Sequence, residues 1–443
     1  MPKVLIMGAG MVSNPLVRHV SRLKGYRVTV ADQNLSAAQR VIGNQRNCRS
    51  IALNATDIAA VTREANQADI VVSILPPEFH VGVAKACLDA NSHLVTTSYI
   101  SPDMEALHEQ FLQRGLLSLN GMGLDPGIDI LSAMQIIHRT QASGGKITGF
   151  FSACGGLPAP EANNNPFGYK FAWTPSGVFK AMTNGAVYLR DGKQESIPAD
   201  QLFANPTQHV FEEIGTLEAY PNRDSVSFIE SFDLQGVSNM LRATFRYPGW
   251  CRFWHKAAHT GILSLDPIAS PNSLRFVDLT SRIIGVKSSA SVREAFAATI
   301  GEEKDSEIVE MAKWLGLFST DAIPTRLDSP FAVIVHLAAK RMKYAKGERD
   351  MSAMQHVFDI ETRDGTRQRQ TSILVDYGIP NGDSSMARTV GLTAAIGAKL
   401  IAEGKITARG VILPTLPEIY NPAIEQLEDM GIKMEHRFET LDG

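Results

Sequence analysis

The alternation of short apolar runs with helical segments over the first 120 residues constrains the fold more than any other feature of this chain. Parallel strands joined by helices give this pattern, because a crossover helix must return the chain to the same end of the sheet. We therefore expect a parallel sheet covered on both faces, with ligands bound beyond the carboxyl ends of its strands. The predicted strands are Lys3–Met7, Arg27–Ala31, Ile51–Leu53, Ile70–Leu75, His93–Thr97 and Gly115–Asn120.

The clearest helix of this region is predicted for residues 101–114. Ser101 is a typical N-cap, and Pro102 suits the first helical position because a helix leaves that N–H without a partner. Gly115 follows the segment and is expected to end the helix.

A glycine turn follows the first strand and opens the first helix, with the sequence Gly8-Ala-Gly10-Met-Val-Ser13. Gly8 permits a tight turn, and Gly10 allows the backbone to approach a pyrophosphate that the helix N-terminus attracts. Ser13 replaces the third glycine of the usual pattern. The position of this turn after a strand favours a dinucleotide-binding site over a purely structural turn.

Asp32 ends the second predicted strand, 24 residues beyond Gly8. An acid near this offset accepts hydrogen bonds from the ribose hydroxyls and repels a 2′-phosphate. The sequence therefore predicts NAD as the preferred cofactor, with NADP as the second candidate. The alternative is a solvated acid that merely ends the strand.

Composition excludes several other classes of function. The net charge of −3 and the absence of basic clusters argue against a nucleic-acid or membrane-surface partner. The four cysteines are scattered without a CxxC pair, which argues against a disulfide framework or a metal site and favours the cytoplasm. No apolar run is long enough for a membrane helix, and the N-terminal run is too short for a signal peptide.

The regular alternation fades after Asn120. We expect a helix over residues 126–142, followed by a long ordered loop or linker over Phe150–Phe171. Arg190–Gly192 and Arg363–Gly365 each place Asp-Gly between strand-like runs, so both are predicted to be β-hairpins with type I′ turns.

Helical patterns dominate residues 237–345, for example in Met311–Phe318 and Pro330–Met342. The tail returns to α/β character. Ala387–Glu403 is rich in small residues and is expected to pack closely against the first domain. Asn421-Pro422 is predicted to start a last helix that Gly431 ends.

Several motifs together resemble the L-glutamate-forming saccharopine dehydrogenase family, and they span nearly the whole chain in order. They are Gly8–Pro15, Val95–Pro102, Gly123–Asp129, Cys154–Glu161, Asn165–Trp173, Tyr220–Ser225, Leu241–Tyr247 and Pro414–Tyr420. The resemblance implies three parts. These are a Rossmann domain (1–124 with 390–443), an α+β substrate domain with a mixed sheet (125–236 with 346–389) and a mostly helical insertion (237–345).

The resemblance also implies a reaction. A hydride leaves the lysine ε-carbon of saccharopine for the nicotinamide, and hydrolysis of the resulting imine gives L-glutamate and 2-aminoadipate 6-semialdehyde. One rival is a related C–N dehydrogenase acting on a carboxyalkyl polyamine or on lysine, and another is a dinucleotide sensor without catalysis. The only expected partners are these small molecules and a second copy in a homodimer, with no nucleic acid and no membrane.

By resemblance, the cofactor contacts fall on the glycine turn, on strand ends and on three residues outside the first domain. They are Gly8, Gly10, Met11, Val12, Ser13, Asp32, Asn54, Leu75, Thr97, Ser98, Leu124, Asp125, Pro126 and Thr174. The fungal NADP-using members carry a basic or neutral residue where Asp32 stands, which again favours NAD.

The implied substrate contacts include two arginines, because a substrate with three carboxylates needs cations that bind bidentately. These contacts are Ser98, Tyr99, Asp125, Arg223, Thr244, Phe245 and Arg246. A salt bridge to a neighbouring acid is the alternative for Arg246, and an ion pair with Asp224 is the alternative for Arg223. Asp125 precedes Pro126, so N-cap of the 126–142 helix is its alternative role.

The acid–base group is open on the sequence. Asp125, Tyr99 and Lys170 are the catalytic candidates, and His80 lies in a turn close to the expected nicotinamide position. A lone histidine in such a turn is more often structural. Cys154 lies beside two glycines, with no adjacent group that would activate its thiol, and is expected to be a buried structural residue.

Overall fold

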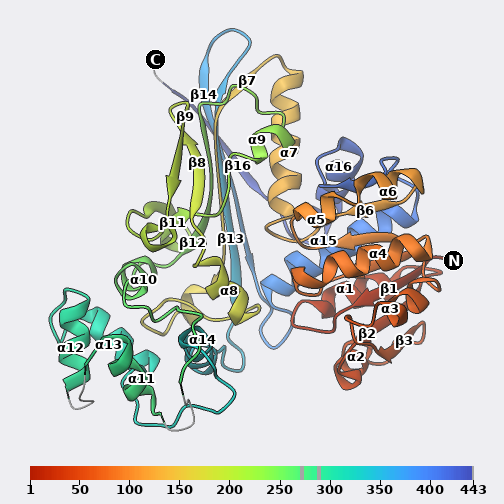
Figure 1. Ribbon diagram of the computed structural model, residues 1–443. Coiled ribbons are helices and arrows are strands. Elements are labelled where there is room, and N and C mark those ends of the chain that lie inside the picture. Colours follow the sequence, from red (N-terminus) through yellow and green to blue (C-terminus); the bar gives the residue numbers. More distant parts are fainter. Residues whose placement is uncertain (270–273, 287–290, 442–443) are drawn as a thin grey trace. The chain divides into compact units, whose positions relative to one another are not determined.

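The computed structural model describes residues 1–269, 274–286 and 291–441, and the chain divides into two compact units (Figure 1). The Rossmann unit comprises Met1–Gly149, Glu230–Gln235 and Met354–Gly443, and the second unit comprises Phe150–Ile229 and Gly236–Ala353. The predicted class is confirmed: the structure combines a parallel Rossmann-type sheet with a second sheet and with further helices. The three-part domain boundaries stay a prediction.

The sheet of the Rossmann unit has seven strands in the order β15-β6-β5-β4-β1-β2-β3, and every neighbouring pair is parallel. The chain order reverses between β1 and β4, where the sheet grows in both directions from β1. Its strands are β1 (Lys3–Met7), β2 (Arg27–Asp32), β3 (Cys48–Ala52), β4 (Ile70–Ser73), β5 (His93–Thr96), β6 (Leu117–Leu119) and β15 (Gly410–Ile412).

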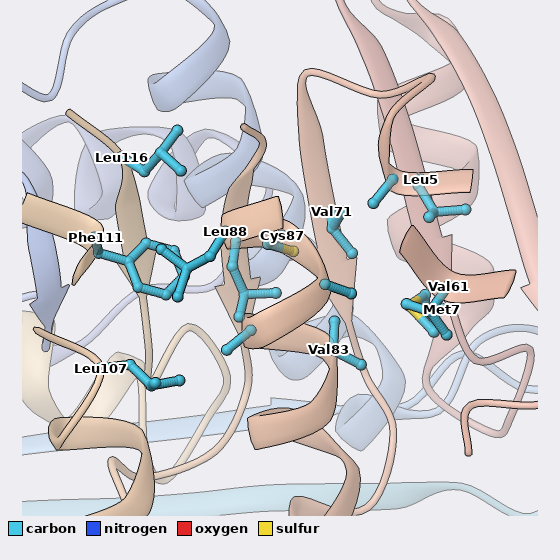
Figure 2. Close-up of a cluster of buried hydrophobic side chains, with 14 of the residues drawn as sticks. Leu5, Met7, Val61, Val71, Val83, Cys87, Leu88, Leu107, Phe111 and Leu116 are labelled. Atoms are coloured by element: carbon cyan, nitrogen blue, oxygen red, sulfur yellow. The ribbon is translucent and has the colours of Figure 1, made fainter. Parts of the chain in front are cut away.

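Helices cover both faces of this sheet, as its apolar strands require. They are α1 (Ser13–Arg22), α2 (Leu35–Ile42), α3 (Ile58–Ala65), η1 (Pro77–Phe79), α4 (His80–Ala90), α5 (Pro102–Glu105), α6 (His108–Gln113), α15 (Ser385–Ala402) and α16 (Pro417–Asp429). Helix α7 (Ile128–Ala142) lies instead against the second sheet, where Ser132 bonds to His356 and Arg139 to Gln370. One core lies between β1, β4 and β5 on one side and α3, α4 and the α5–α6 segment on the other (Figure 2). Leu5, Val71, Val83 and Phe111 are at most 1% exposed in it.

The tail completes the Rossmann unit, as its small residues predicted. Helix α15 packs against α1, and a Cβ on Gly391 would lie 2.7 Å from the carbonyl oxygen of Val12. Only glycine permits that approach, so the C-terminal segment supports the helix that follows the glycine turn.

The second sheet has the strand order β10-β11-β12-β7-β13-β14-β16, with β8 paired to β12 and β9 paired to β8. Along the chain, the division between the two units falls within β7, after Gly149, and within β13, after Ala353. Its strands are β7 (Lys146–Pro158), β8 (Ala186–Arg190), β9 (Lys193–Ile197), β10 (Thr207–Phe211), β11 (Gly215–Pro221), β12 (Asn239–Arg246), β13 (Asp350–Glu361), β14 (Arg367–Tyr377) and β16 (Glu435–Thr440).

The remaining helices belong to the second unit, except that α9 extends from the second unit into the segment 230–235 of the Rossmann unit. They are η2 (Pro160–Ala162), α8 (Pro175–Ala181), η3 (Ala199–Gln201), α9 (Phe228–Ser231), α10 (Trp250–Ala258), α11 (Phe276–Ile283), α12 (Val292–Thr299), α13 (Glu307–Leu315) and α14 (Pro330–Arg341). The helical character predicted between residues 237 and 345 is thus confirmed for the described part of that range, with β12 at its start.

Phe150–Phe171 was predicted to be a loop or linker, and this is wrong for its first part. Strand β7 extends to Pro158, and most of its residues are buried. A strand inside a sheet that is covered on both faces has no alternation of apolar and polar residues, so its glycines and small residues suggested a loop.

Three further boundaries differ from the sequence prediction. The helix expected over 101–114 is two short helices, because the Leu107 N–H bonds to the carbonyl of Met104 and so leaves the α-helical pattern. Helix α16 begins at Pro417, since this proline takes the first helical position that the prediction gave to Pro422. Of the two predicted type I′ turns, Asp191-Gly192 has the required positive φ at both residues, whereas only Gly365 has it in the second turn.

The four cysteines form no disulfide, as predicted. Among the described residues, no helix is long and apolar enough to cross a membrane.

Candidate functional site

The glycine turn lies at the carboxyl end of β1, beside the point where the strand order reverses. The Gly8 N–H donates to the carbonyl of Ala31 at 2.8 Å, which ties the turn to the end of β2. A Cβ on Gly10 would meet no atom within 4 Å, so the backbone there is open to a ligand. Helix α1 has no side-chain cap and no acid in its first turn, so its N-terminal N–H groups can attract a pyrophosphate. These residues fit a dinucleotide.

Ser13 fills the place of the third glycine without disturbing this turn. Its side chain is buried, and its hydroxyl donates to the carbonyl of Gly10 at 2.7 Å. The serine side chain therefore stabilises the turn by bonding to its backbone. Met11, by contrast, is 55% exposed beside it.

Asp32 accepts hydrogen bonds from the protein backbone with both of its carboxylate oxygens. The Ala9 N–H donates to Oδ2 at 2.8 Å, and the Asn34 N–H donates to Oδ1 at 2.8 Å. The carboxylate therefore fixes the glycine turn and the start of the next loop, a role that neither of the two readings of the sequence included.

The other predicted cofactor residues of the Rossmann unit lie at or just beyond the carboxyl ends of its strands, which meet at one edge of a parallel sheet. Asn54 follows β3 and is exposed, Leu75 follows β4, and Thr97 follows β5. Leu124 and Pro126 lie in the turn between β6 and α7 and are buried. Thr174 belongs to the second unit, where it is exposed at the N-cap position of α8.

His80 joins two serines at this edge. It is only 4% exposed at the start of α4. Its Nδ1 lies 3.0 Å from the hydroxyl of Ser73 at the end of β4, and its Nε2 lies 2.9 Å from the hydroxyl of Ser98 beyond β5. Burial lowers the pKa of His80 to about 4, so the ring is neutral at physiological pH.

The N-cap role that the sequence offered as an alternative for Asp125 is wrong. Helix α7 begins at Ile128, and its N-cap is Gly127, whose N–H donates to the side chain of Asp129 at 2.6 Å. The chain folds back between Gly123 and Gly127, which carries Pro126 away from the first helical position. Asp125 instead accepts a hydrogen bond from the phenol of Tyr99, so two catalytic candidates are in contact.

In the second unit, Arg246 is a buried cation surrounded by aromatic rings. It is 5% exposed, and its guanidinium lies 4.7 Å from the ring centre of Tyr169, 5.3 Å from that of Trp250 and 5.9 Å from that of Tyr220. Burial raises the pKa of Tyr169, and it raises the pKa of Tyr220 to about 12, so both rings are neutral phenols. Cation–π contacts hold the charge in place without neutralising it.

The hydrogen bonds of Arg246 are incomplete within the described part of the chain. Its Nη1 donates to the carbonyl of Phe245 at 2.7 Å, and its Nε has no partner among these residues. No carboxylate of the described residues forms a salt bridge with it. The salt-bridge alternative for Arg246 is therefore absent among the described residues, and its Nε is a donor that lacks an acceptor there.

Thr244 and Phe245, which precede Arg246 on β12, lie on opposite faces of the sheet. Thr244 lies on the same face as Arg246, because side chains alternate along a strand. The Phe245 side chain packs on the other face against His209 and Phe211, so only its backbone can face a ligand beside Arg246.

Arg223 differs from Arg246 in its exposure and in its surroundings. It is exposed and has a left-handed backbone with φ 54°. The ion pair with Asp224 that the sequence suggested is absent among the described residues, and Asp224 instead accepts from the N–H groups of Val226 and Ser227. The Arg223 side chain is thus free of a neighbouring acid but is not preorganised.

Lys170 is 4% exposed, and its ammonium lies 2.5 Å from the carboxylate of Glu348. Burial alone would raise the pKa of Glu348, but hydrogen bonds from Lys170, from the Ala345 N–H and from Asn164 outweigh burial and lower it. This closed network favours a structural role for Lys170, and its part in catalysis stays a prediction. Cys154 is buried, in the position expected of a structural thiol.

Comparison with known families covers almost the entire chain. Residues 4–119 match a family model described as the saccharopine dehydrogenase NADP binding domain, and residues 123–432 match the saccharopine dehydrogenase C-terminal domain. The chain belongs to the saccharopine dehydrogenase family. The resemblance drawn from its motifs is therefore confirmed.

Relatives in this family match over the full length. The chain is 35% identical to the saccharopine dehydrogenase [NADP(+), L-glutamate-forming] of Schizosaccharomyces pombe, with 100% of both chains covered. It is 37% identical to the protein of the same name in Saccharomyces cerevisiae, with 96% of both covered. The solved apo saccharopine dehydrogenase (L-Glu forming) from Saccharomyces cerevisiae superposes with a TM-score of 0.89 over 99% of this chain and 100% of that one, at 34% identity.

These findings overturn the prediction that NAD is the preferred cofactor. The full-length relatives are named as NADP(+) enzymes, and the family model over the Rossmann region is described as NADP binding. The sequence argument failed because it assigned the Asp32 carboxylate to the ribose hydroxyls. The structure shows that this carboxylate holds the backbone of Ala9 and Asn34, which accounts for an acid at the end of β2 without any reference to the cofactor.

Sequence reasoning missed the residues that support the predicted ones. Ser73 bonds to His80, Glu348 pairs with Lys170, and Trp250 stacks on Arg246. Ser73 and Trp250 lie on different elements from the residues they support, and Glu348 lies 178 positions from Lys170. The only available signal was the aromatic density around Trp250, which indicates a packed cluster but not the cation inside it.

Proposed function

We propose that this protein is an NADP-dependent, L-glutamate-forming saccharopine dehydrogenase. The observation that carries the proposal is the match to relatives of that name at 35% and 37% identity over the whole chain. The buried, incompletely bonded Arg246 supports it, because an oxidoreductase for a tricarboxylate substrate needs such a cation.

The proposed reaction oxidises a carbon–nitrogen bond. NADP, when bound, accepts the hydride from the lysine-side carbon of saccharopine. The amine of saccharopine loses a proton, and water then adds to the carbon, so that the carbon–nitrogen bond breaks to give L-glutamate and 2-aminoadipate 6-semialdehyde. The reverse direction is a reductive condensation of the same two products.

The Rossmann unit supplies the cofactor contacts in this proposal. Its glycine turn and the N-terminus of α1 bind the pyrophosphate, and the strand-end residues hold the rest of the dinucleotide. The proposed contacts remain those of the sequence prediction: Gly8, Gly10, Met11, Val12, Ser13, Asp32, Asn54, Leu75, Thr97, Ser98, Leu124, Asp125 and Pro126, with Thr174 from the second unit.

We assign each charged group of the substrate to a residue of opposite charge. Arg246 binds one carboxylate of saccharopine, and the exposed Arg223 closes on another. Asp125, hydrogen-bonded to Tyr99, pairs with an ammonium group of the substrate. The Tyr99–Asp125 pair is also the best placed to move the amine proton, since a phenol and a carboxylate in contact can pass a proton between them.

Steady-state kinetics test the proposal directly. The purified protein is incubated with NADP and saccharopine, and NADPH is followed by absorbance while glutamate is measured separately. We expect equal amounts of NADPH and glutamate. The reverse reaction should consume NADPH only when glutamate and the semialdehyde are both present. An absence of saccharopine-dependent NADPH formation would reject the function.

The rival substrates are tested in the same assay. The alternative dehydrogenase for a carboxyalkyl polyamine or lysine is not favoured, because three relatives that match over at least 96% of both chains are named for saccharopine. We expect no turnover with carboxynorspermidine or lysine. Turnover of either at a higher kcat/KM than saccharopine would reverse the assignment.

A homodimer and a cytoplasmic location complete the proposal. The location is inferred from the scattered free cysteines, whereas no sequence feature selects the dimer. Light scattering of the purified protein measures the first, and fractionation of source cells measures the second.

A further inference from the structure

Three hydrogen-bonding side chains form an ordered series at the carboxyl edge of the Rossmann sheet. Ser73 is fully buried at the end of β4, His80 is 4% exposed, and Ser98 is partly exposed beyond the end of β5. The series therefore leads from the protein interior to the edge where the cofactor is proposed to bind. Its two contacts, of 3.0 and 2.9 Å, are short enough for good hydrogen bonds.

The buried end of the series determines the tautomer of His80. A neutral imidazole donates from one nitrogen and accepts at the other. The hydroxyl of Ser73 has no partner other than His80 among the described residues. If Nδ1 carried the proton, the Ser73 O–H would be buried without an acceptor, which is costly. Ser73 therefore donates to Nδ1, and the ring proton lies on Nε2.

This tautomer sets the direction of the second hydrogen bond. His80 Nε2–H donates to the oxygen of Ser98 at 2.9 Å, so the Ser98 O–H cannot donate to the ring. The backbone of Ser98 is held as well, because its carbonyl accepts the Gly121 N–H at 2.9 Å. No described residue accepts the Ser98 hydroxyl proton, which leaves it available to a ligand.

We propose that His80 is a positioning residue, which with Ser73 holds the Ser98 hydroxyl as a hydrogen-bond donor toward an oxygen acceptor of the bound ligands. The inference rests on the proposed function. It adds to that function the direction of a hydrogen bond and the residue that fixes it. The acceptor belongs either to the dinucleotide or to a carboxylate of the substrate, and the two sources are separated by which KM responds.

The test compares two amide substitutions of matched polarity. His80→Gln places its amide nitrogen where Nε2 lies, so it still donates to Ser98. His80→Asn places its amide near Nδ1, so it still reaches Ser73 but not Ser98. We expect His80→Asn to raise one KM about tenfold, the loss expected for one hydrogen bond, and His80→Gln to stay within about threefold of the parent. Equal losses in the two variants would overturn the proposal.

A double-mutant cycle asks whether His80 acts through Ser98. Ser98→Ala is expected to raise the same KM, and adding His80→Asn should then raise it by less than about twofold, because the donor is already gone. Additive effects would mean that His80 acts independently of Ser98, and the proposal would fall.

A binding measurement separates this proposal from the proposed function. NADPH binding, followed by its fluorescence, is titrated in the same variants with and without saccharopine, and it needs no turnover. Absence of turnover in the parent rejects the function. A parent that turns over, combined with His80→Asn and His80→Gln variants of equal affinity and equal KM values, rejects only the role of His80.

His436 provides a matched control on the second sheet. Its Nδ1 lies 2.8 Å from the hydroxyl of Ser372, so it is also a histidine bonded to a serine. We expect His436→Asn and His436→Gln to leave both KM values unchanged. A rise equal to that of His80→Asn would show that any loss of a serine–histidine bond has this effect, and would overturn the positioning role.

Discussion

The two units differ in whether the polar groups predicted to bind ligands are already hydrogen-bonded within the protein. In the Rossmann unit these groups are already bonded to the protein: Asp32 to backbone N–H groups, Ser98 to His80 and Asp125 to Tyr99. In the second unit, Arg246 is buried among aromatic rings with an Nε that has no partner among the described residues.

This difference shows two ways of preparing a binding site. Bonds within the protein orient neutral or exposed groups before a ligand arrives, which lowers the entropic cost of binding. A buried cation without a salt bridge is instead stabilised when a carboxylate binds. The carboxylate replaces the favourable interactions with water that the cation lost on burial.

The largest effect is expected for Arg246. Arg246→Met should lower kcat/KM for saccharopine by about 30- to 1,000-fold, the value of a charge-assisted bidentate contact, and should leave the KM for NADP unchanged. The free energy of unfolding without ligand should change by less than about 1 kcal/mol, since the guanidinium forms no salt bridge within the described residues that the substitution would break. Near-normal kinetics together with a large loss of stability would make Arg246 structural.

Lys170 provides the contrast within the same unit, because its buried charge is paired. Glu348→Gln should lower the free energy of unfolding by about 3 kcal/mol, since it leaves the Lys170 ammonium buried without its counter-ion. Urea denaturation measures this. The exposed pair of Arg349 and Glu161 is the control, and Glu161→Gln should cost less than about 1 kcal/mol. Equal effects would remove the distinction between paired and unpaired cations.

Asp125 tests the charge at the Rossmann edge. Asp125→Asn keeps an acceptor for the Tyr99 phenol but removes the negative charge. We expect kcat/KM for saccharopine to fall by about 10- to 100-fold, because a charge-assisted contact with the substrate ammonium becomes neutral. Stability should hardly change, since Asp125 does not cap α7. Full activity in this variant would exclude an electrostatic role.

His80 predicts a dependence of stability on pH. Burial lowers its pKa to about 4 in the folded protein, against the ordinary value of 6.5 in the unfolded chain. Between these values the unfolded chain binds the extra proton, so stability is complete above about pH 6.5 and is lost as the pH falls toward 4. From pH 7 to pH 5 the parent should lose about 2 kcal/mol more than His80→Gln does in urea unfolding. Identical losses would show that the folded protein accepts the proton as readily as the unfolded chain.

The smallest effect is expected for Asp32. Asp32→Asn keeps an oxygen acceptor for one backbone N–H but removes the negative charge at the end of β2. Since a carboxylate repels a 2′-phosphate, the KM for NADP should fall by about two- to threefold at low salt, and the gain should shrink as salt is added. A rise in this KM would mean that the charge is needed to hold the turn.

Much of the Rossmann unit was predictable because its signals are local. The runs that became β1 and β2 are buried strands with helices between them, and the turn at Gly8 needs only the residues that form it. The family could be recognised for a related reason. Its motifs, such as Gly123–Asp129, are contiguous in sequence and can be read without knowing what they contact.

The candidate site was predictable only as a set of residues, because the partners of those residues are distant in sequence. Ser98 was identified, but the histidine that orients it lies on α4, 18 residues away. Lys170 was taken as a catalytic candidate, and its ion pair with Glu348 joins residues 178 positions apart.

The parallel sheet, the glycine turn and the family were predictable from the amino-acid sequence, because strand periodicity, turn geometry and contiguous motifs are all properties of neighbouring residues. The hydrogen-bond partners of the charged groups became known only from the folded structure. It bonded Asp32 to the backbone and left the Nε of Arg246 without a partner in the described chain, since hydrogen bonds and burial depend on residues that folding brings together.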